Sequence, residues 1–212
     1  MSDRFAPQSS GDVADLVRHQ PLCWIVSRGD DPRGSVAPLL VRCDDAGAVI
    51  GFEGHLARSN PQLAVLMADP HALVLCLGPN GYIAASWMQD RDWAPTWNFA
   101  QGQFSVTLEF FEGAAEVEAH LTEMVTVMEA GRPGAWSIEE MGQRFHGVAR
   151  GVVGFRATID RADSRFKLGQ DERDGPYADI LKGLGDGDLS AWMQRFNPDR
   201  PETDSACEPT AA

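Results

Sequence analysis

The chain has 212 residues, of which 43% are apolar and 23% charged, and its formal net charge is −13 at pH 7. These values indicate that most of the chain folds, as one globular domain with at most an appendage. The acidic excess argues against broad binding to nucleic acid or to anionic membranes, whose charges repel it.

The sequence predicts no membrane-spanning segment. No apolar run approaches the roughly 18 residues that a spanning helix needs. The N-terminal stretch MSDRFAPQSSGD lacks the apolar core of a signal peptide. We therefore expect a cytoplasmic protein with no membrane partner.

The first part of the chain reads as helix, strands and helix. Ser10 or Asp12 can cap the first helix, and Asn60 can cap the second, with Pro61 in its first turn. The expected elements are a helix in 9–21, a strand in 22–29, a hairpin in 34–54 that turns at 44–47, and a helix in 60–70.

The rest of the chain adds strands and helices in an irregular order. Ser137, followed three residues later by Glu140, predicts a capping box. The expected elements are a strand in 71–79, a turn at 78–81 leading into an extended stretch, a strand in 94–113 with a break near Gly102, helices in 116–130 and 137–145, a strand in 151–170, and helices in 176–185 and 188–196.

This order of elements favours one fold class. Strands predominate and do not alternate regularly with helices, which argues against a doubly wound parallel sheet. We expect an α+β fold that is mainly β, an antiparallel barrel with peripheral helices. A single domain should span 1–197, and the polar, proline-rich residues 198–212 should form a disordered tail.

Several familiar functional motifs are missing from the sequence. It has no GxGxxG, no P-loop, no GxSxG and no helix-turn-helix with a basic second helix. The four cysteines form no CxxC pair and the five histidines no i,i+4 pair, so no metal site is predicted. No catalytic residue is assigned.

A polar cluster lies in the stretch GHLARSNPQ, just after the hairpin. Arg58, Ser59 and Asn60 precede a helix start, and together they offer a guanidinium fork, a hydroxyl and free N–H groups that suit a phosphate monoester. The alternative is that Ser59 and Asn60 only cap the helix and Arg58 makes a surface ion pair. His55 is the histidine of interest, with a structural role as its alternative.

Two later stretches concentrate aromatic and polar residues. In GPNGYIAASWM, Ser86 and Trp87 should lie on an extended segment and face opposite ways. In APTWNF, Trp97 beside Thr96 and Asn98 could form a wall against a flat ring system. Simple packing of the tryptophans is the alternative in both places.

These stretches together resemble one known family. GHLARSNPQ, GPNGYIAASW, PTWNF and the late FRATIDRADSRFKLGQ occur in the same order in the PaiB-type family of FMN-binding split-barrel proteins. The resemblance covers about residues 5–196, and four ordered motifs are far more specific than one. It implies a six-stranded antiparallel split barrel, a homodimer with FMN at the subunit interface, and chemistry of the flavin-dependent oxidoreductase kind.

The resemblance also implies which residues bind the cofactor. Arg58 and Ser59 would hold the FMN phosphate, with His55 and Asn60 supporting the loop. The residues that line the ribityl chain and the ring would be Ser86, Trp87, Thr96, Trp97 and Asn98.

The late motif contributes Lys167 and Gln170 to the implied FMN site. Lys167 would stabilise the reduced flavin anion, or else meet the phosphate. One departure stands out: the typical family pattern continues after Asn98 into a Val-His-Ala stretch, whereas this chain has Gln101 and Gln103 there. This departure predicts a change in cofactor contacts or in activity.

Two alternative functions come with the same resemblance. Members of the family are described as negative transcriptional regulators, which need no catalysis, but the acidic charge makes direct DNA binding by this chain unfavourable. Relatives of the piperazate-synthase kind bind haem b, and His55 would then be the axial ligand. The substrate, the electron donor and any target genes are not predicted.

Overall fold

The computed structural model describes residues 3–200 and shows two compact units. The larger unit comprises Ser9–Leu77 and Gln101–Ser164, and the smaller unit comprises 3–8, 78–100 and 165–200. Most of the expected tail, residues 201–212, lies outside the described residues. The expectation of a single domain over 1–197 stays a prediction.

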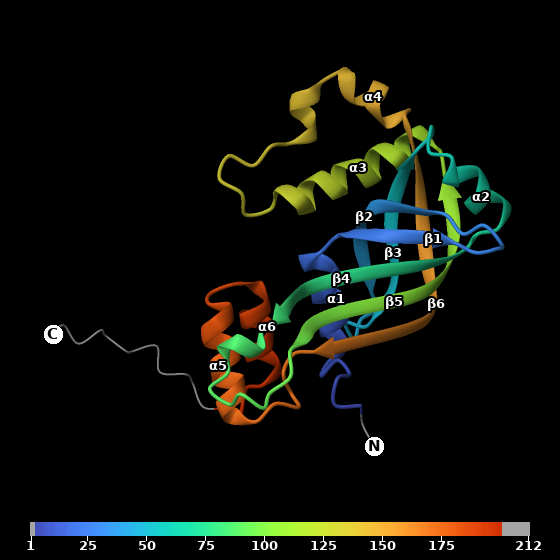
Figure 1. The fold of residues 1–212 in the computed structure, drawn as a ribbon. Helices are drawn as coiled ribbons and strands as arrows, with labels where there is room; N and C mark the ends of the chain where they lie inside the picture. Colours follow the sequence, from blue (N-terminus) through green and yellow to red (C-terminus); the bar gives the residue numbers. More distant parts are fainter. Residues whose placement is uncertain (1–2, 201–212) are drawn as a thin grey trace. The chain divides into compact units, whose positions relative to one another are not determined.

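Six antiparallel strands close into a barrel in the order β1-β2-β3-β6-β5-β4 (Figure 1). This confirms the predicted fold class. The strands are β1 (Leu22–Ser27), β2 (Gly34–Cys43), β3 (Val49–Ala57), β4 (His71–Ile83), β5 (Thr96–Phe111) and β6 (Val152–Lys167).

Alternating burial explains why these segments form strands around one core. In β1, Cys23 and Ile25 are fully buried, whereas Trp24 between them is 53% exposed. This period of two is the signature of a strand with one face inside the barrel. Phe52 and Phe104 meet edge to face in the core, with ring centroids 5.0 Å apart.

The register of β3 places polar side chains on the outer wall of the barrel. Because Phe52 and Leu56 point into the core, Glu53 and His55 emerge on the opposite face. Glu53 is paired with a residue of β6, Arg156, and His55 lies opposite Gly154 of the same strand.

Helix α3 (Ala114–Glu129) lies over this outer wall (Figure 1). Its buried residues, Val117, His120 and Met124, recur at helical spacing and form the face turned to the barrel. The other helices of the larger unit are α1 (Ser10–His19), α2 (Gln62–Ala68), the 3₁₀ helix η2 (Ile138–Met141) and α4 (Arg144–Ala149).

The smaller unit contains the ends of β4, β5 and β6 together with η1 (Ala85–Trp87), α5 (Asp174–Leu184) and α6 (Asp188–Phe196). Helices α5 and α6 pack against each other. Phe166 anchors an aromatic cluster, because its ring centroid lies 5.2 Å from that of Phe196 and 5.8 Å from that of Trp192.

Two predicted interruptions of strands were wrong. β4 continues through the expected turn at 78–81, and β5 continues through Gly102. Both glycines serve close packing: a Cβ at Gly81 would lie 2.9 Å from a methyl group of Leu189, and one at Gly102 would lie 2.7 Å from the ring of Phe104.

Two finer predictions also need correction. Ser86 and Trp87 lie in the 3₁₀ helix η1 and not on a strand. The N-cap of α1 is Ser9, with Asp12 three residues later as its capping-box partner, because the Asp12 carboxylate accepts a hydrogen bond from the Ser9 amide at 2.7 Å.

No helix among residues 3–200 is both long enough and apolar enough to cross a membrane.

Candidate functional site

Arg58 lies in the larger unit, directly after β3, and its guanidinium contacts two other groups of the protein. Its Nε donates to the carbonyl oxygen of Arg150 at 2.9 Å, and its Nη1 pairs with the Glu112 carboxylate. The side chains of Arg58 and Glu112 are 42% and 51% exposed. A surface pair of this kind is worth about 0–1 kcal/mol, so an anionic ligand could replace Glu112 at low cost.

Ser59 and Asn60 form the turn between β3 and α2. Ser59 is exposed. The Asn60 side chain accepts a hydrogen bond from the Gln62 amide at 2.9 Å and donates one to the Ser35 hydroxyl at 2.9 Å. The N-cap of α2 is Pro61 and not Asn60 as expected, but the Asn60 side chain binds the first amide of α2 and ties the turn to β2, which fixes the position of its neighbours Arg58 and Ser59.

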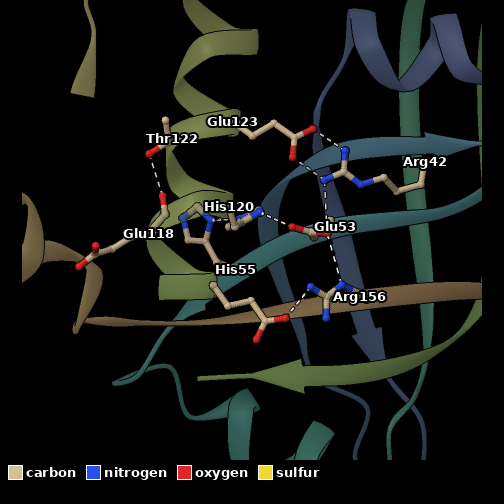
Figure 2. Close-up of polar contacts among 9 residues, drawn as sticks. Arg42, Glu53, His55, Glu118, His120, Thr122, Glu123 and Arg156 are labelled. Carbon is tan, nitrogen blue, oxygen red and sulfur yellow. Dashed lines mark hydrogen bonds and ion pairs between the residues drawn. The ribbon is translucent and has the colours of Figure 1, made fainter. Parts of the chain in front are cut away.

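His55 belongs to a chain of side chains on the outer wall of the barrel, and Figure 2 shows these residues beside α3. Its Nδ1 lies 3.0 Å from Nε2 of His120, and Nδ1 of His120 lies 3.0 Å from a carboxylate oxygen of Glu53. His120 is 2% exposed. A buried imidazole thus connects a buried carboxylate to a second imidazole.

Two arginines close the carboxylate end of this chain. Arg42 of β2 and Arg156 of β6 reach Glu53 at 3.3 and 3.6 Å. Each arginine also binds α3, Arg42 through Glu123 at 2.5 Å and Arg156 through Glu116 at 2.6 Å. These ion pairs connect α3 to the barrel on both sides of the histidine pair.

Burial makes both histidines hard to protonate. It lowers the pKa of His55 to about 4, with the neighbouring His120 as a second cause. Burial also lowers the pKa of His120, and the Glu53 carboxylate opposes this shift. Both imidazoles are therefore neutral at pH 7.

The residues implied for the flavin ring lie in the smaller unit. Nζ of Lys167 donates to the Thr96 hydroxyl at 2.5 Å. Among the described residues, no carboxylate forms an ion pair with Lys167. A half-buried ammonium group without a counter-ion is unusual in a chain this acidic.

The residue that follows Thr96, the hydrogen-bond partner of Lys167, belongs to a pair of exposed aromatic side chains. Trp97, adjacent to Thr96, is 56% exposed, and Tyr82 of β4 is 49% exposed. Their ring centroids are 5.8 Å apart with the planes tilted by 59°. Asn98 points the other way: it is buried, and its amide nitrogen lies 3.5 Å from the sulfur of Met193.

The remaining implied residues have mainly structural contacts. Ser86 is exposed, and Trp87 packs so closely on α5 that a Cβ at Gly183 would lie 2.3 Å from its indole. The Gln170 side chain accepts from the Leu168 amide and donates to the Phe166 carbonyl, both at 2.7 Å. Gln170 therefore holds the turn that follows Lys167.

The structure separates the implied residues into two groups. His55, Arg58, Ser59 and Asn60 belong to the larger unit, and the rest belong to the smaller unit. The sequence-based search missed His120 and Glu53. The available signal was weak: a single histidine on the apolar face of a predicted helix.

The donor groups of the smaller unit fit a flavin. An ammonium group and a hydroxyl can meet the polar edge of the isoalloxazine, and exposed aromatic side chains can cover its faces. The described residues contain no group of three or more His, Cys, Asp or Glu side chains that could hold a metal ion.

Comparison with known proteins shows the family of the chain. A family model described as "Putative FMN-binding domain" matches residues 1–161. Protease synthase and sporulation protein PAI 2 of Bacillus subtilis is 27% identical over 132 residues, which are 62% of this chain and 63% of that protein. The match therefore spans less than two thirds of that relative.

Solved structures show the same fold at low sequence identity. The conserved hypothetical protein Rv2991 from Mycobacterium tuberculosis superposes with a TM-score of 0.56 at 13% identity, over 79% of this chain and 89% of that one. The FAD and heme binding protein from Mycobacterium smegmatis gives 0.56 at 16% identity, over 84% and 79%. With the family model covering most of its length, this chain belongs to the PaiB-type family of FMN-binding split-barrel flavoproteins.

Proposed function

We propose that the chain binds FMN through Lys167, Thr96 and Trp97 at the ring and acts as a flavin-dependent oxidoreductase. The observation that carries this proposal is the Lys167 ammonium group, which is bonded to Thr96 and has no carboxylate partner among the described residues. Bound FMN would supply the electron transfer. The role of Lys167 would be to hold positive charge near the ring edge that becomes anionic on reduction.

Arg58 and Ser59 are the proposed contacts to the FMN phosphate. The Arg58 guanidinium is exposed enough to be reached, and Asn60 holds its turn in place. A phosphate dianion would bind Arg58 more strongly than the single carboxylate of Glu112 does, because it carries more charge and more acceptor oxygens.

A homodimer is proposed because the barrel exposes an apolar face. Trp24 is paired across strands with Val36 on β2 and Leu75 on β4. The exposed residues of this face are Leu22 at 60%, Trp24 at 53%, Val36 at 47% and Leu77 at 58%. Contiguous apolar surface of this kind marks an interaction site, and a second copy of this chain is the proposed occupant.

The cytoplasmic location, the role as a transcriptional regulator and haem b as an alternative cofactor stay predictions from the sequence. The net charge of −13 continues to disfavour direct contact with DNA.

A titration with two flavins tests the proposed function. Riboflavin lacks the phosphate of FMN, so the quenching of flavin fluorescence should show tighter binding of FMN. Arg58→Ala should weaken FMN binding by about 1.5–3 kcal/mol and leave riboflavin binding unchanged. Equal loss for both flavins would contradict the phosphate assignment, and absence of flavin binding would contradict the proposed function.

A further inference from the structure

Two of the buried side chains inside the barrel are thiols that lie next to each other. Cys23 of β1 is fully buried, and Cys76 of β4 is 3% exposed. Strands β1 and β4 pair antiparallel where the barrel closes, with Trp24 opposite Leu75 (Figure 1). One step further along the same register, Cys23 lies opposite Cys76. Because burial alternates along both strands, the two thiols point to the same interior.

One backbone oxygen brings the two sulfur atoms together. The carbonyl oxygen of Gln20, at the end of α1, accepts a hydrogen bond from the thiol of Cys23 and another from the thiol of Cys76, both at 3.6 Å. The thiols also interact with each other. A hydrogen bond from Cys23 lowers the pKa of Cys76, and the same contact, together with burial, raises the pKa of Cys23. The two sulfur atoms are therefore neighbours.

This placement fits a disulfide bond. Directly opposite residues of an antiparallel pair have Cα atoms about 4.5–5.5 Å apart, and disulfides span Cα distances of about 4.4–6.8 Å. Rotation of the two thiols therefore suffices to form an S–S bond with little movement of the strands. Cys43 of β2 has different surroundings, because its sulfur lies 3.9 Å from Nη2 of Arg18.

We propose that Cys23 and Cys76 are a redox-active dithiol, which a small peroxide converts to a disulfide between β1 and β4. The bond would link the two strands whose pairing closes the barrel. In the reduced protein both thiols donate to the Gln20 carbonyl, and a disulfide has no S–H group to donate, so the end of α1 would lose both contacts. No residue proposed to contact FMN takes part, so the proposal does not depend on the flavin site.

The reaction balances with hydrogen peroxide as the oxidant. The sulfur of Cys76, once its proton is lost, attacks one peroxide oxygen. An S–O bond forms, the O–O bond breaks, and the departing oxygen takes up that proton and leaves as water. The sulfur of Cys23 then attacks the sulfur of Cys76, so that an S–S bond forms, the S–O bond breaks, and hydroxide leaves with the Cys23 proton as a second water. The two sulfur atoms lose two electrons, which the peroxide gains.

Burial of the pair explains why the oxidant must be small. Neither sulfur offers a surface that a bulky disulfide could reach in the folded barrel. Hydrogen peroxide is little larger than water. Cys23 is the second residue of β1, and strand ends open locally more readily than strand centres, which gives a small molecule a route to the pair.

Intact-mass measurement of the full-length protein tests the proposal. Cys43→Ser combined with Cys207→Ser, the latter outside the described residues, leaves only the proposed pair. The folded protein is treated with hydrogen peroxide and then unfolded in iodoacetamide. The expected product is about 2 Da lighter than the dithiol, takes up no iodoacetamide, and yields a peptide that joins Cys23 to Cys76. Two alkylated thiols, or separately oxidised sulfinic acids, would overturn the proposal.

A matched control moves one thiol by one inward position. In the same background, Cys76→Ala combined with Val74→Cys keeps two buried cysteines but places the second opposite Ile25 and diagonal to Cys23. The yield of disulfide should fall at least about tenfold, because diagonal neighbours lie too far apart for an S–S bond. An equal yield from the folded control would contradict the pairing. If the control does not fold, the mass and the peptide map of the Cys23–Cys76 protein decide.

Discussion

Arg58 and Glu112 form an ion pair between the turn after β3 and the residue that follows β5, at the position where the cofactor phosphate is proposed. The pair is solvent-exposed, so it contributes little to stability. Glu112 instead competes with the phosphate for the same guanidinium.

Removing this competition should improve flavin binding. Glu112→Gln keeps the size of the side chain and removes its charge, so the affinity for FMN should rise about two- to fivefold, corresponding to a surface ion pair of up to about 1 kcal/mol. Glu109→Gln, an exposed carboxylate nearby on β5, is the control. Isothermal titration is the measurement, and a lower affinity in Glu112→Gln would argue against Arg58 as the phosphate ligand.

Lys167 should control the redox properties of the bound flavin. Lys167→Met removes the ammonium group that contacts Thr96, so the reduced anion loses its nearest proposed cation. The reduction potential of bound FMN should become more negative, and its affinity should fall by about tenfold or less. Dye-equilibrium titration measures the potential, with Lys182→Met on the exposed face of α5 as control. An unchanged reduction potential in Lys167→Met would mean that Lys167 does not lie near the flavin ring.

Most of the order of the elements could be predicted from sequence, because apolar periods are local signals. The one helix expected in 137–145 is instead the 3₁₀ helix η2 followed by α4, and η1 was not expected. The continuous β4 could not be predicted, since the Gly-Pro-Asn-Gly composition of residues 78–81 is typical of a turn. Leu189 packs closely against Gly81, and this contact joins residues far apart in the chain, so local composition does not indicate it.

Contacts between distant residues also limited the prediction of the candidate site. Arg58 and Lys167 were proposed from short motifs, which a sequence displays directly. His120 lies 65 residues from His55, and only the placement of α3 on the outer wall brings the two rings together. Nothing local to either histidine indicates its partner.

The depressed pKa of His55 predicts a loss of stability in mild acid. Between its usual value of 6.5 and about 4, the unfolded chain binds a proton that the folded chain does not. Stability should therefore fall by about 2 kcal/mol as the pH drops through this window, after allowance for partial exposure.

A comparison of variants isolates this effect. In urea unfolding at several pH values, His55→Gln should reduce the slope between pH 6.5 and 4. Thr126→Ala, at an exposed and uncharged position of α3, should keep it. The same slope in wild type and His55→Gln would mean that His55 titrates normally.

Gly154 should tolerate no side chain. Its Cβ would meet the Phe111 ring at 2.1 Å, so Gly154→Ala should cost at least about 1–3 kcal/mol of unfolding free energy as the ring is displaced. Gly147→Ala on α4, where nothing lies within 4 Å, should be neutral or stabilising by up to about 1 kcal/mol. Equal denaturant midpoints for the two variants would contradict the packing described for Phe111.

The apolar face around Trp24 should hold two copies together. Trp24→Glu should raise the dissociation constant of the homodimer more than tenfold, because burying a large apolar side chain contributes about 1.5–3 kcal/mol. Val127→Glu, which adds the same charge at an exposed position of α3, should leave the dimer intact. Light scattering during size exclusion measures the mass, and a wild-type monomer would contradict this interface.

The absorption spectrum of the freshly purified protein, followed by release and identification of its chromophore, tests the flavin assignment most directly. The account predicts a yellow protein that releases FMN, about one molecule per chain. A colourless protein that binds no added FMN, or one with the Soret band of haem, would contradict it.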